Sequence, residues 1–156
     1  MKSKVQLSLY CKIITCVAIV LLIVGVFSSW GVERKFVLGT IVLVCLVGAG
    51  LFYSPRSIEA SDASLVIHRV LKSKVIPYSD ISSVDSCIPS AGGLRLCGSG
   101  GFMGYWGYFS DIIIGSYFGY YGDMDQCILV KLKNGKQYVI SCCDSHKMIE
   151  AIEAHL

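Results

Sequence analysis

The chain has 156 residues, of which 54% are hydrophobic and only 16% are charged, so there is room for one ordinary domain besides any membrane segment. Residues 1–53 carry five basic residues and one acid, whereas residues 54–156 carry nine basic and ten acidic residues. Because a domain that neutralises several phosphates normally has a basic face, this balance argues against nucleic-acid binding.

Two apolar stretches dominate the first third of the chain. Residues 13–30 and 36–53 each contain 18 uncharged residues, 11 of them Ile, Leu, Val or Phe. A helix of that length is about 27 Å long, close to the thickness of the bilayer hydrocarbon. Trp30 and Tyr53 at the ends are typical of the membrane interface. We predict a two-helix anchor over residues 1–53, with the lipid bilayer as the partner of residues 13–53.

The five-residue link 31–35 is too short for anything but a tight helical hairpin, and Gly48, Ala49 and Gly50 are expected to let the two helices approach closely. The alternative for the first stretch is a cleaved signal peptide. No small-x-small cleavage site follows it, however, and the second apolar stretch comes at once.

The orientation of this hairpin follows from its flanking charges. A hairpin places both termini on one side, where four cations lie close to the apolar stretches: Lys2, Lys4, Lys12 and Arg56. The link offers only Arg34 and Lys35. The positive-inside rule therefore predicts a multi-pass protein of the cell (inner) membrane, with both termini and the C-terminal domain in the cytoplasm.

The eight cysteines are interpreted as reduced thiols. Three lie in or beside the apolar stretches, which leaves an odd number in the C-terminal part. A Cys87–Cys97 bridge stays open as an alternative if the domain faces outward.

After Tyr53 the pattern changes to short strands. Ser54-Pro55 ends the helix, because proline disfavours a helical residue before it. Strand candidates follow at residues 57–60, 64–70, 74–77 and 81–85. The clearest hairpin pairs residues 126–133 with 136–141 around Asn134-Gly135, which suits a type I′ turn. Alternation places Ile128, Val130 and Leu132 on one face of this hairpin, with Lys131 and Lys133 on the other.

A final helix is predicted over residues 145–155, with Asp144 as its N-cap. The apolar residues of this segment form one stripe, consisting of Met148, Ile149, Ile152 and Leu156. The C-terminal domain is therefore expected to be rich in strands and closed by one amphipathic helix.

The middle of the chain is rich in glycine and aromatic residues. Residues 91–122 hold ten of the 16 glycines, and residues 102–121 hold nine of the 17 aromatic side chains. A third membrane span would place Asp111 inside the bilayer, and a disordered segment would expose the aromatic rings. We predict two strands with glycine-rich bends, whose aromatic rings pack in the core or rest on the membrane interface.

Three stretches, in this order, resemble bacterial PH-like domains, especially small membrane-anchored ones. They are residues 75–81 (VIPYSDI), residues 95–107 (RLCGSGGFMGYWG) and residues 134–136 leading to Ile140-Ser141. The resemblance covers residues 55–156 and implies a PH-like domain over residues 54–156. That fold would be a bent antiparallel sheet of about seven strands forming a mainly-β, partly open barrel, closed at one end by the C-terminal α-helix. One departure is Ser141-Cys142-Cys143, where the family often has Ser-Pro.

No catalytic, cofactor or metal site is predicted. Cys142, Cys143 and His146 are close in sequence, but no second ligand pair has a usual metal-binding spacing. The other histidines are unsuited to catalysis, because His68 lies on a strand and His155 at a frayed end. The glycines of residues 98–101 lack the Lys-Ser/Thr of a phosphate loop and are better explained as bends.

Two functions remain, both non-enzymatic. In the first, the domain is a scaffold that docks a protein partner or a second copy through exposed aromatic residues, with Phe102, Tyr105, Trp106 and Tyr108 as candidates. In the second, the domain binds or senses lipid, with Arg69, Lys72 and Lys74 contacting headgroups. Because the anchor already places the domain at the membrane, extra lipid affinity is not needed for localisation, which favours the first function.

Overall fold

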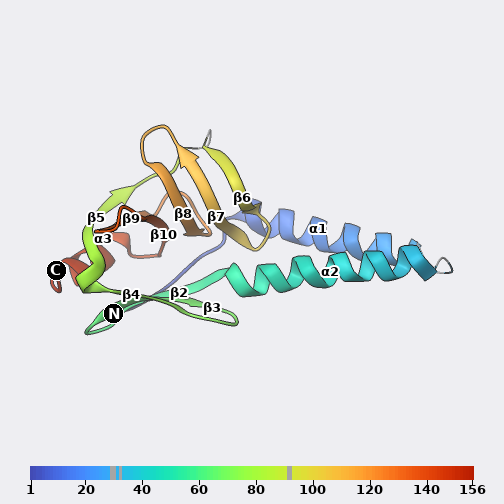
Figure 1. Cartoon of the computed structure of the whole chain (residues 1–156), viewed down its shortest axis with the longest axis horizontal. Helices are drawn as coiled ribbons and strands as arrows, with labels where there is room; N and C mark the ends of the chain where they lie inside the picture. Colours follow the sequence, from blue (N-terminus) through green and yellow to red (C-terminus); the bar gives the residue numbers. More distant parts are fainter. Residues whose placement is uncertain (29–30, 32, 91–92) are drawn as a thin grey trace.

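The computed structural model describes residues 1–28, 31, 33–90 and 93–156. Two long antiparallel helices, α1 (Leu9–Ser28) and α2 (Glu33–Tyr53), lead into a β domain at one end of the molecule (Figure 1). Helix α1 begins four residues before the predicted apolar stretch, and the expected interface residue Trp30 lies outside the described residues. Only 6% of the most apolar 18-residue stretch of each helix is buried.

The glycines that lie at the contact between the two helices differ from those expected. A Cβ atom at Gly39 would lie 3.4 Å from Val26, whereas one at Gly48 would meet nothing within 4 Å. Gly50 instead faces the β domain, where its Cβ would lie 2.5 Å from the sulfur of Met103. The predicted use of Gly48 and Gly50 in helix–helix contact is therefore wrong, because the helix ends are occupied by a turn of the β domain.

The first sheet has the order β1-β2-β3-β4 and is antiparallel. Strands β2 (Pro55–Ala60), β3 (Ser64–Arg69) and β4 (Lys74–Pro77) confirm the predicted short strands. Strand β1 (Lys2–Lys4) was not predicted, since an alternation over only three residues is too short to indicate a strand by itself. It pairs with β2 with Ser3 opposite Ile58, so the N-terminal residues belong to the sheet before the chain enters α1.

The second sheet has the order β5-β9-β10-β8-β7-β6. It is formed by β5 (Ile81–Cys87), β6 (Leu94–Gly101), β7 (Gly104–Asp111), β8 (Gly115–Tyr121), β9 (Cys127–Leu132) and β10 (Gln137–Ser141). The glycine-rich middle therefore contains three strands and not two. Two tight turns separate them, at residues 102–103 and 112–114, and each is closed by a glycine with positive φ, Gly104 and Gly115.

The expected partly open barrel of about seven antiparallel strands is not formed. The two sheets are separate, and one pair, β10 with β8, runs parallel instead of antiparallel. The break falls between β4 and β5, where Pro77 ends β4 and the 3₁₀ turn Tyr78–Asp80 redirects the chain. Since proline supplies no amide to a ladder, pairing does not continue across this point. The fold is PH-like, with two open sheets in place of a barrel.

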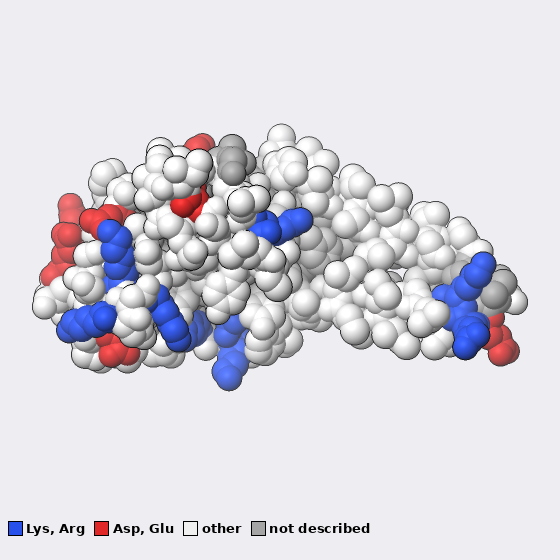
Figure 2. All heavy atoms as spheres, turned by 45° about the horizontal axis from the view of Figure 1, so that its top comes forward, with Lys and Arg blue, Asp and Glu red and all other residues white. Residues whose placement is uncertain are grey.

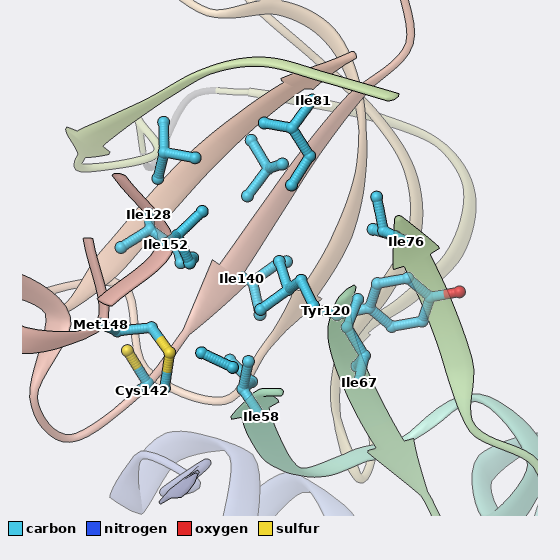
Figure 3. Packing of buried hydrophobic residues seen from close by; sticks show 14 of the residues in the cluster. Ile58, Ile67, Ile76, Ile81, Tyr120, Ile128, Ile140, Cys142, Met148 and Ile152 are labelled. Atoms are coloured by element: carbon cyan, nitrogen blue, oxygen red, sulfur yellow. The ribbon is translucent and has the colours of Figure 1, made fainter. Parts of the chain in front are cut away.

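The main core lies between the two sheets and the helix α3 (Ser145–Glu153) (Figure 3). Ile58 and Ile67 come from the first sheet, Ile128 and Ile140 from the second, and Met148 from α3; all five are fully buried. A smaller cluster on the other face of the second sheet contains Phe109, Tyr117, Tyr121, Cys127, Leu129 and Val139. Strand β9 is thus buried on both faces, whereas the sequence alternation predicted burial of one face only.

The predicted C-terminal helix is confirmed, and it buries Met148 and Ile152 of its predicted apolar face. It ends at Glu153, so Leu156 lies beyond it and is 54% exposed. Asp144 occupies the N-cap position without a side-chain capping bond, and its backbone carbonyl accepts from the Met148 amide at 3.0 Å. The expected stripe is therefore one residue shorter than the sequence suggested.

Candidate membrane-facing site

The β6–β7 turn lies against the domain-side ends of both helices (Figure 1). The amide of Met103 donates to Thr15 Oγ1 of α1 at 2.7 Å, and its carbonyl accepts from Ser54 Oγ, directly after α2, at 2.7 Å. Met103 has a φ of 54°, which a turn between two positive-φ glycines tolerates. The turn therefore connects the β domain to both helices through hydrogen bonds as well as through packing.

Three of the four predicted contact aromatics are used inside the molecule. Trp106 stacks on Tyr53 of α2 at 5.3 Å with an interplanar angle of 12°, and its Nε1 donates to the Phe102 carbonyl at 3.1 Å. Tyr105 stacks on Tyr121 at 4.8 Å, and burial raises the pKa of Tyr105 to about 12. The Phe102 ring lies beside Gly50 of α2. Phe102 and Trp106 therefore contact α2, whereas the Tyr105–Tyr121 stack joins β7 to β8 within the sheet.

Tyr108 is the one candidate aromatic that is exposed, at 58%. It belongs to an exposed apolar surface that sequence patterns did not indicate. The β6-edge surface, as we call it, consists of Leu94, Leu96, Tyr108, Ile112 and Ile113, each at least 58% exposed. Strand β6 is the edge strand of its sheet, and Leu94 lies opposite Ser110, just before the turn that carries Ile112 and Ile113. Exposed edges and apolar patches are typical of interaction sites.

The predicted basic trio is only partly available to a ligand. The guanidinium of Arg69 lies 5.2 Å from the ring centre of Phe52, 5.8 Å from that of Tyr53 and 5.7 Å from that of Tyr120. Lys74 Nζ lies 5.9 Å from the ring centre of Tyr138. Lys72 is exposed, and its backbone carbonyl accepts a hydrogen bond from Arg69 Nε at 2.6 Å. Arg69 therefore joins the end of α2 to the sheet.

A different set of cations gathers beside the helix ends. A groove of about 670 Å³ lies where the N-terminal segment and β2 meet the start of α1 and the end of α2. It is lined by Lys2, Lys4, Val5, Leu7, Ser54, Pro55, Arg56, Ser57, Val70 and Met103. None of these ten residues is acidic. The groove combines three cations with a largely apolar wall.

Backbone geometry explains why the cations converge. Lys2 and Lys4 alternate with buried Ser3 on β1, so both side chains point to the same face of the strand. On β2, the pairing with β3 shifts between Pro55 and Ser57, which leaves Arg56 as the extra residue of a bulge. A bulge re-aims the side chain that it carries. Arg56 is held there by its carbonyl, which accepts from the Val5 amide at 3.0 Å.

The groove retains positive charge after internal pairing. Lys2 Nζ lies 3.6 Å from Glu59 Oε2, and that carboxylate is also 2.8 Å from His68 Nε2. Within the described ranges, no ion pair involves Lys4 or Arg56. Sequence reasoning used these cations only to orient the chain. The Lys-x-Lys alternation of residues 2–4 was the available signal, and it becomes informative only once β1 is known to be a strand.

The remaining reactive side chains show no catalytic or metal-binding arrangement in the part of the chain that the structure describes. No group of three or more His, Cys, Asp or Glu residues there could hold a metal ion. Burial raises the pKa of Cys87 to about 12 and that of Cys142 to about 11, which disfavours the reactive thiolate. Cys87 and Cys97 are both free and lie on opposite edge strands of one sheet, so they form no bridge.

The family model of the bacterial PH domain matches residues 56–156, about two thirds of the chain. The chain belongs to this family. The match begins at Arg56, so α1, α2 and β1 lie outside it. No match is found among curated proteins or among solved structures. PH domains are in general non-catalytic binding modules, and no enzyme family is indicated for this PH-domain protein. Family membership identifies the fold and leaves the ligand open.

Proposed function

We propose that this protein is a non-enzymatic, membrane-anchored binding module, in which α1 and α2 cross the cell membrane and display the PH-like domain at its cytoplasmic face. The observation that carries the proposal is the exposure of both helices. Each is long and apolar enough to cross a bilayer, yet each is only 6% buried over its most apolar stretch. A core helix of a soluble protein would be mostly buried, so these side chains require lipid or another cover.

The contacts of the N-terminal residues favour an anchor over a cleaved signal peptide. Strand β1 completes the first sheet, the Ser8 amide donates to the Gly122 carbonyl at 2.9 Å, and Thr15 accepts from Met103. Cleavage after α1 would remove all three contacts from the domain. Retention of α1 keeps the domain complete and makes the hairpin a permanent anchor.

The charge distribution supports the cytoplasmic orientation. Basic residues appear on the β domain and again at the far tip of the hairpin, with an uncharged surface between them (Figure 2). Lys2, Lys4 and Arg56 lie at the domain end, whereas Arg34 and Lys35 at the tip are accompanied by Glu33. By the positive-inside rule, we expect the domain end, which carries more cations, to lie in the cytoplasm.

For the binding role, the β6-edge surface is the proposed docking site for a protein partner or a second copy. Leu94 and Leu96 lie at the start of the edge strand β6, and the other three members lie on β7 and in the β7–β8 turn. The helix contacts of Phe102 and Trp106 lie towards the opposite end of the β6–β7 hairpin. An added strand from a partner would satisfy the free backbone groups of β6 while burying Leu94 and Leu96.

The test uses membranes that contain the full chain. Alkaline washing should leave the protein in the pellet, and a photo-crosslinker attached to exposed Cys97 on β6 should yield a specific adduct with a partner or a second copy. Cys97→Ser should abolish the adduct, and the pair Ile112→Asp/Ile113→Asp should lower its yield several-fold. Release by alkali would overturn the anchor, whereas a retained protein without an adduct would overturn the docking surface.

A further inference from the structure

We propose that the groove lined by Lys2, Lys4 and Arg56 binds the phosphate-bearing headgroup of an anionic phospholipid, taken from the leaflet at which α1 and α2 join the β domain. This inference rests on the proposed membrane anchoring and names a ligand class for a second site of the domain. The site is distinct from the basic trio predicted from sequence, of which Arg69 and Lys74 lie against aromatic rings.

The position of the groove selects a lipid as its ligand. Its lining includes Leu7, two residues before α1, and Ser54, the first residue after α2. Met103, also in the lining, contacts both helix ends through Thr15 and Ser54. A ligand in this groove therefore lies at the depth where the helices leave the hydrocarbon, which is where lipid headgroups and glycerol backbones are found.

The groove has a cationic end and an apolar end, as the headgroup and the acyl chains of a lipid would require. Leu7, Val70 and Met103 form the wall beside the helix ends, whereas Lys2 and Lys4 lie on β1, further from them. The phosphate would be placed between Lys4 and Arg56, and the glycerol and first acyl carbons against Leu7 and Met103. Arg56 offers a planar fork of donors suited to phosphate oxygens, and Lys4 adds a point charge.

The charge balance favours an anion over a zwitterion. No carboxylate lines the groove, and Lys4 and Arg56 have no ion pair within the described residues. A second hollow at the same N-terminal segment, of about 250 Å³, has Asp123 and Asp125 as its charged lining and is unsuited to a phosphate. The bulge on β2 gives Arg56 a direction that regular strand alternation would not, and Arg56 lines the groove.

The experiment compares lipid retention by full-length variants. The protein is extracted from nanodiscs of equal phosphatidylglycerol and phosphatidylcholine, and the lipids that remain bound are counted by native mass spectrometry. The wild type should retain phosphatidylglycerol selectively. Because each cation near the surface contributes about a fivefold preference, the pair Lys4→Gln/Arg56→Gln should weaken this retention roughly 30-fold. Arg56→Lys, which keeps the charge, should retain most of it.

The matched control is Lys133→Gln/Lys136→Gln, which removes the same charge from the exposed β9–β10 turn and should leave retention unchanged. Equal retention of both lipids by the wild type, or full retention by the groove variant, would overturn the proposal. Displacement of the lipid by an equal concentration of soluble glycerophosphoglycerol would overturn the lipid assignment in favour of a free phosphate ester. Alkaline washing tests the anchor separately, so loss of anchoring and loss of headgroup binding are distinguishable.

Discussion

The two N-terminal helices and the β domain use their apolar residues in opposite ways. Leu21 in the middle of α1 is 65% exposed, whereas Ile140 in the second sheet is fully buried. Both regions contribute to the same hydrophobic composition, yet only the β domain forms a core of its own. This contrast supports the proposed membrane location of the two helices, and five predictions test it.

The largest effect is expected in the β-domain core. Ile140→Ala should lower the free energy of unfolding by about 4 kcal/mol, because it leaves a cavity between the two sheets. Denaturant unfolding of the detergent-solubilised chain, followed by near-UV circular dichroism, measures this loss. Leu156→Ala, at a side chain that is 54% exposed, should change it by less than about 0.5 kcal/mol. Similar losses for both variants would contradict the described core.

The same substitution at two equally exposed leucines tests the helices directly. Leu21→Lys should disfavour membrane insertion of α1 by about 3 kcal/mol, since a lysine at the centre of a span is costly. Leu96→Lys on β6, where the leucine is 64% exposed, should leave insertion unchanged. The fraction of protein that resists an alkaline wash measures the difference. If Leu21→Lys is as harmless as Leu96→Lys, α1 does not lie in lipid.

Asp111 is a buried carboxylate in the β domain that is stabilised by hydrogen bonds. It accepts from the side chain of Ser90 at 2.5 Å and from the amides of Ser90, Ile113 and Ile114. The bond from the Ser90 hydroxyl and these amide bonds lower the pKa of Asp111 to about 2. Asp111→Ala should therefore cost about 2–3 kcal/mol of stability, measured by denaturant unfolding at pH 7.

The sign of the pH dependence follows from this lowered pKa. The carboxylate stabilises the fold fully above about pH 4, its usual range when unfolded, and this contribution is lost as the pH falls towards about 2. The wild-type unfolding midpoint should decline across that window, and Asp111→Asn should remove this part of the decline. An identical pH profile for the variant would show that Asp111 does not contribute.

A smaller effect is expected where the N-terminal segment crosses the sheet. A Cβ atom at Gly122 would collide with the Gln6 carbonyl and lie 3.1 Å from the Leu7 Cα. Gly122→Ala should cost about 1–3 kcal/mol and increase hydrogen exchange in β1. Gly48→Ala, whose Cβ meets nothing within 4 Å, is the matched control and should not destabilise the fold. Unchanged exchange in β1 would mean that the segment is not held at Gly122.

The last test compares how fast individual cysteine thiols react in the unsubstituted protein. At pH 8, Cys97, which is exposed on β6, should react with a maleimide long before Cys87 and Cys142, whose pKa values burial raises to about 12 and about 11. Peptide mass spectrometry over time measures the order, and labelling in denaturant shows that every thiol can react. Early labelling of Cys87 would contradict its partial burial against the cluster that contains Phe109 and Tyr117.

Sequence patterns alone predicted the features that depend on neighbours along the chain. Continuous apolarity predicted both helices, Asn134-Gly135 predicted the β9–β10 hairpin, and the spacing of Met148 and Ile152 predicted α3 and the face that it buries. Each of these signals lies within a few residues of the structure that it specifies. The resemblance to the PH family added the order of the elements.

Long-range pairing decided the rest. Whether residues 2–4 are a tail or a strand depends on β2, more than 50 residues away, and that pairing brings Lys4 beside Arg56. The separation of the sheets at Pro77 and the stacking of Trp106 on Tyr53 likewise depend on contacts between distant segments. The residues that make such contacts lie far apart in the sequence and share no local pattern. The candidate groove could therefore be recognised only in the folded chain.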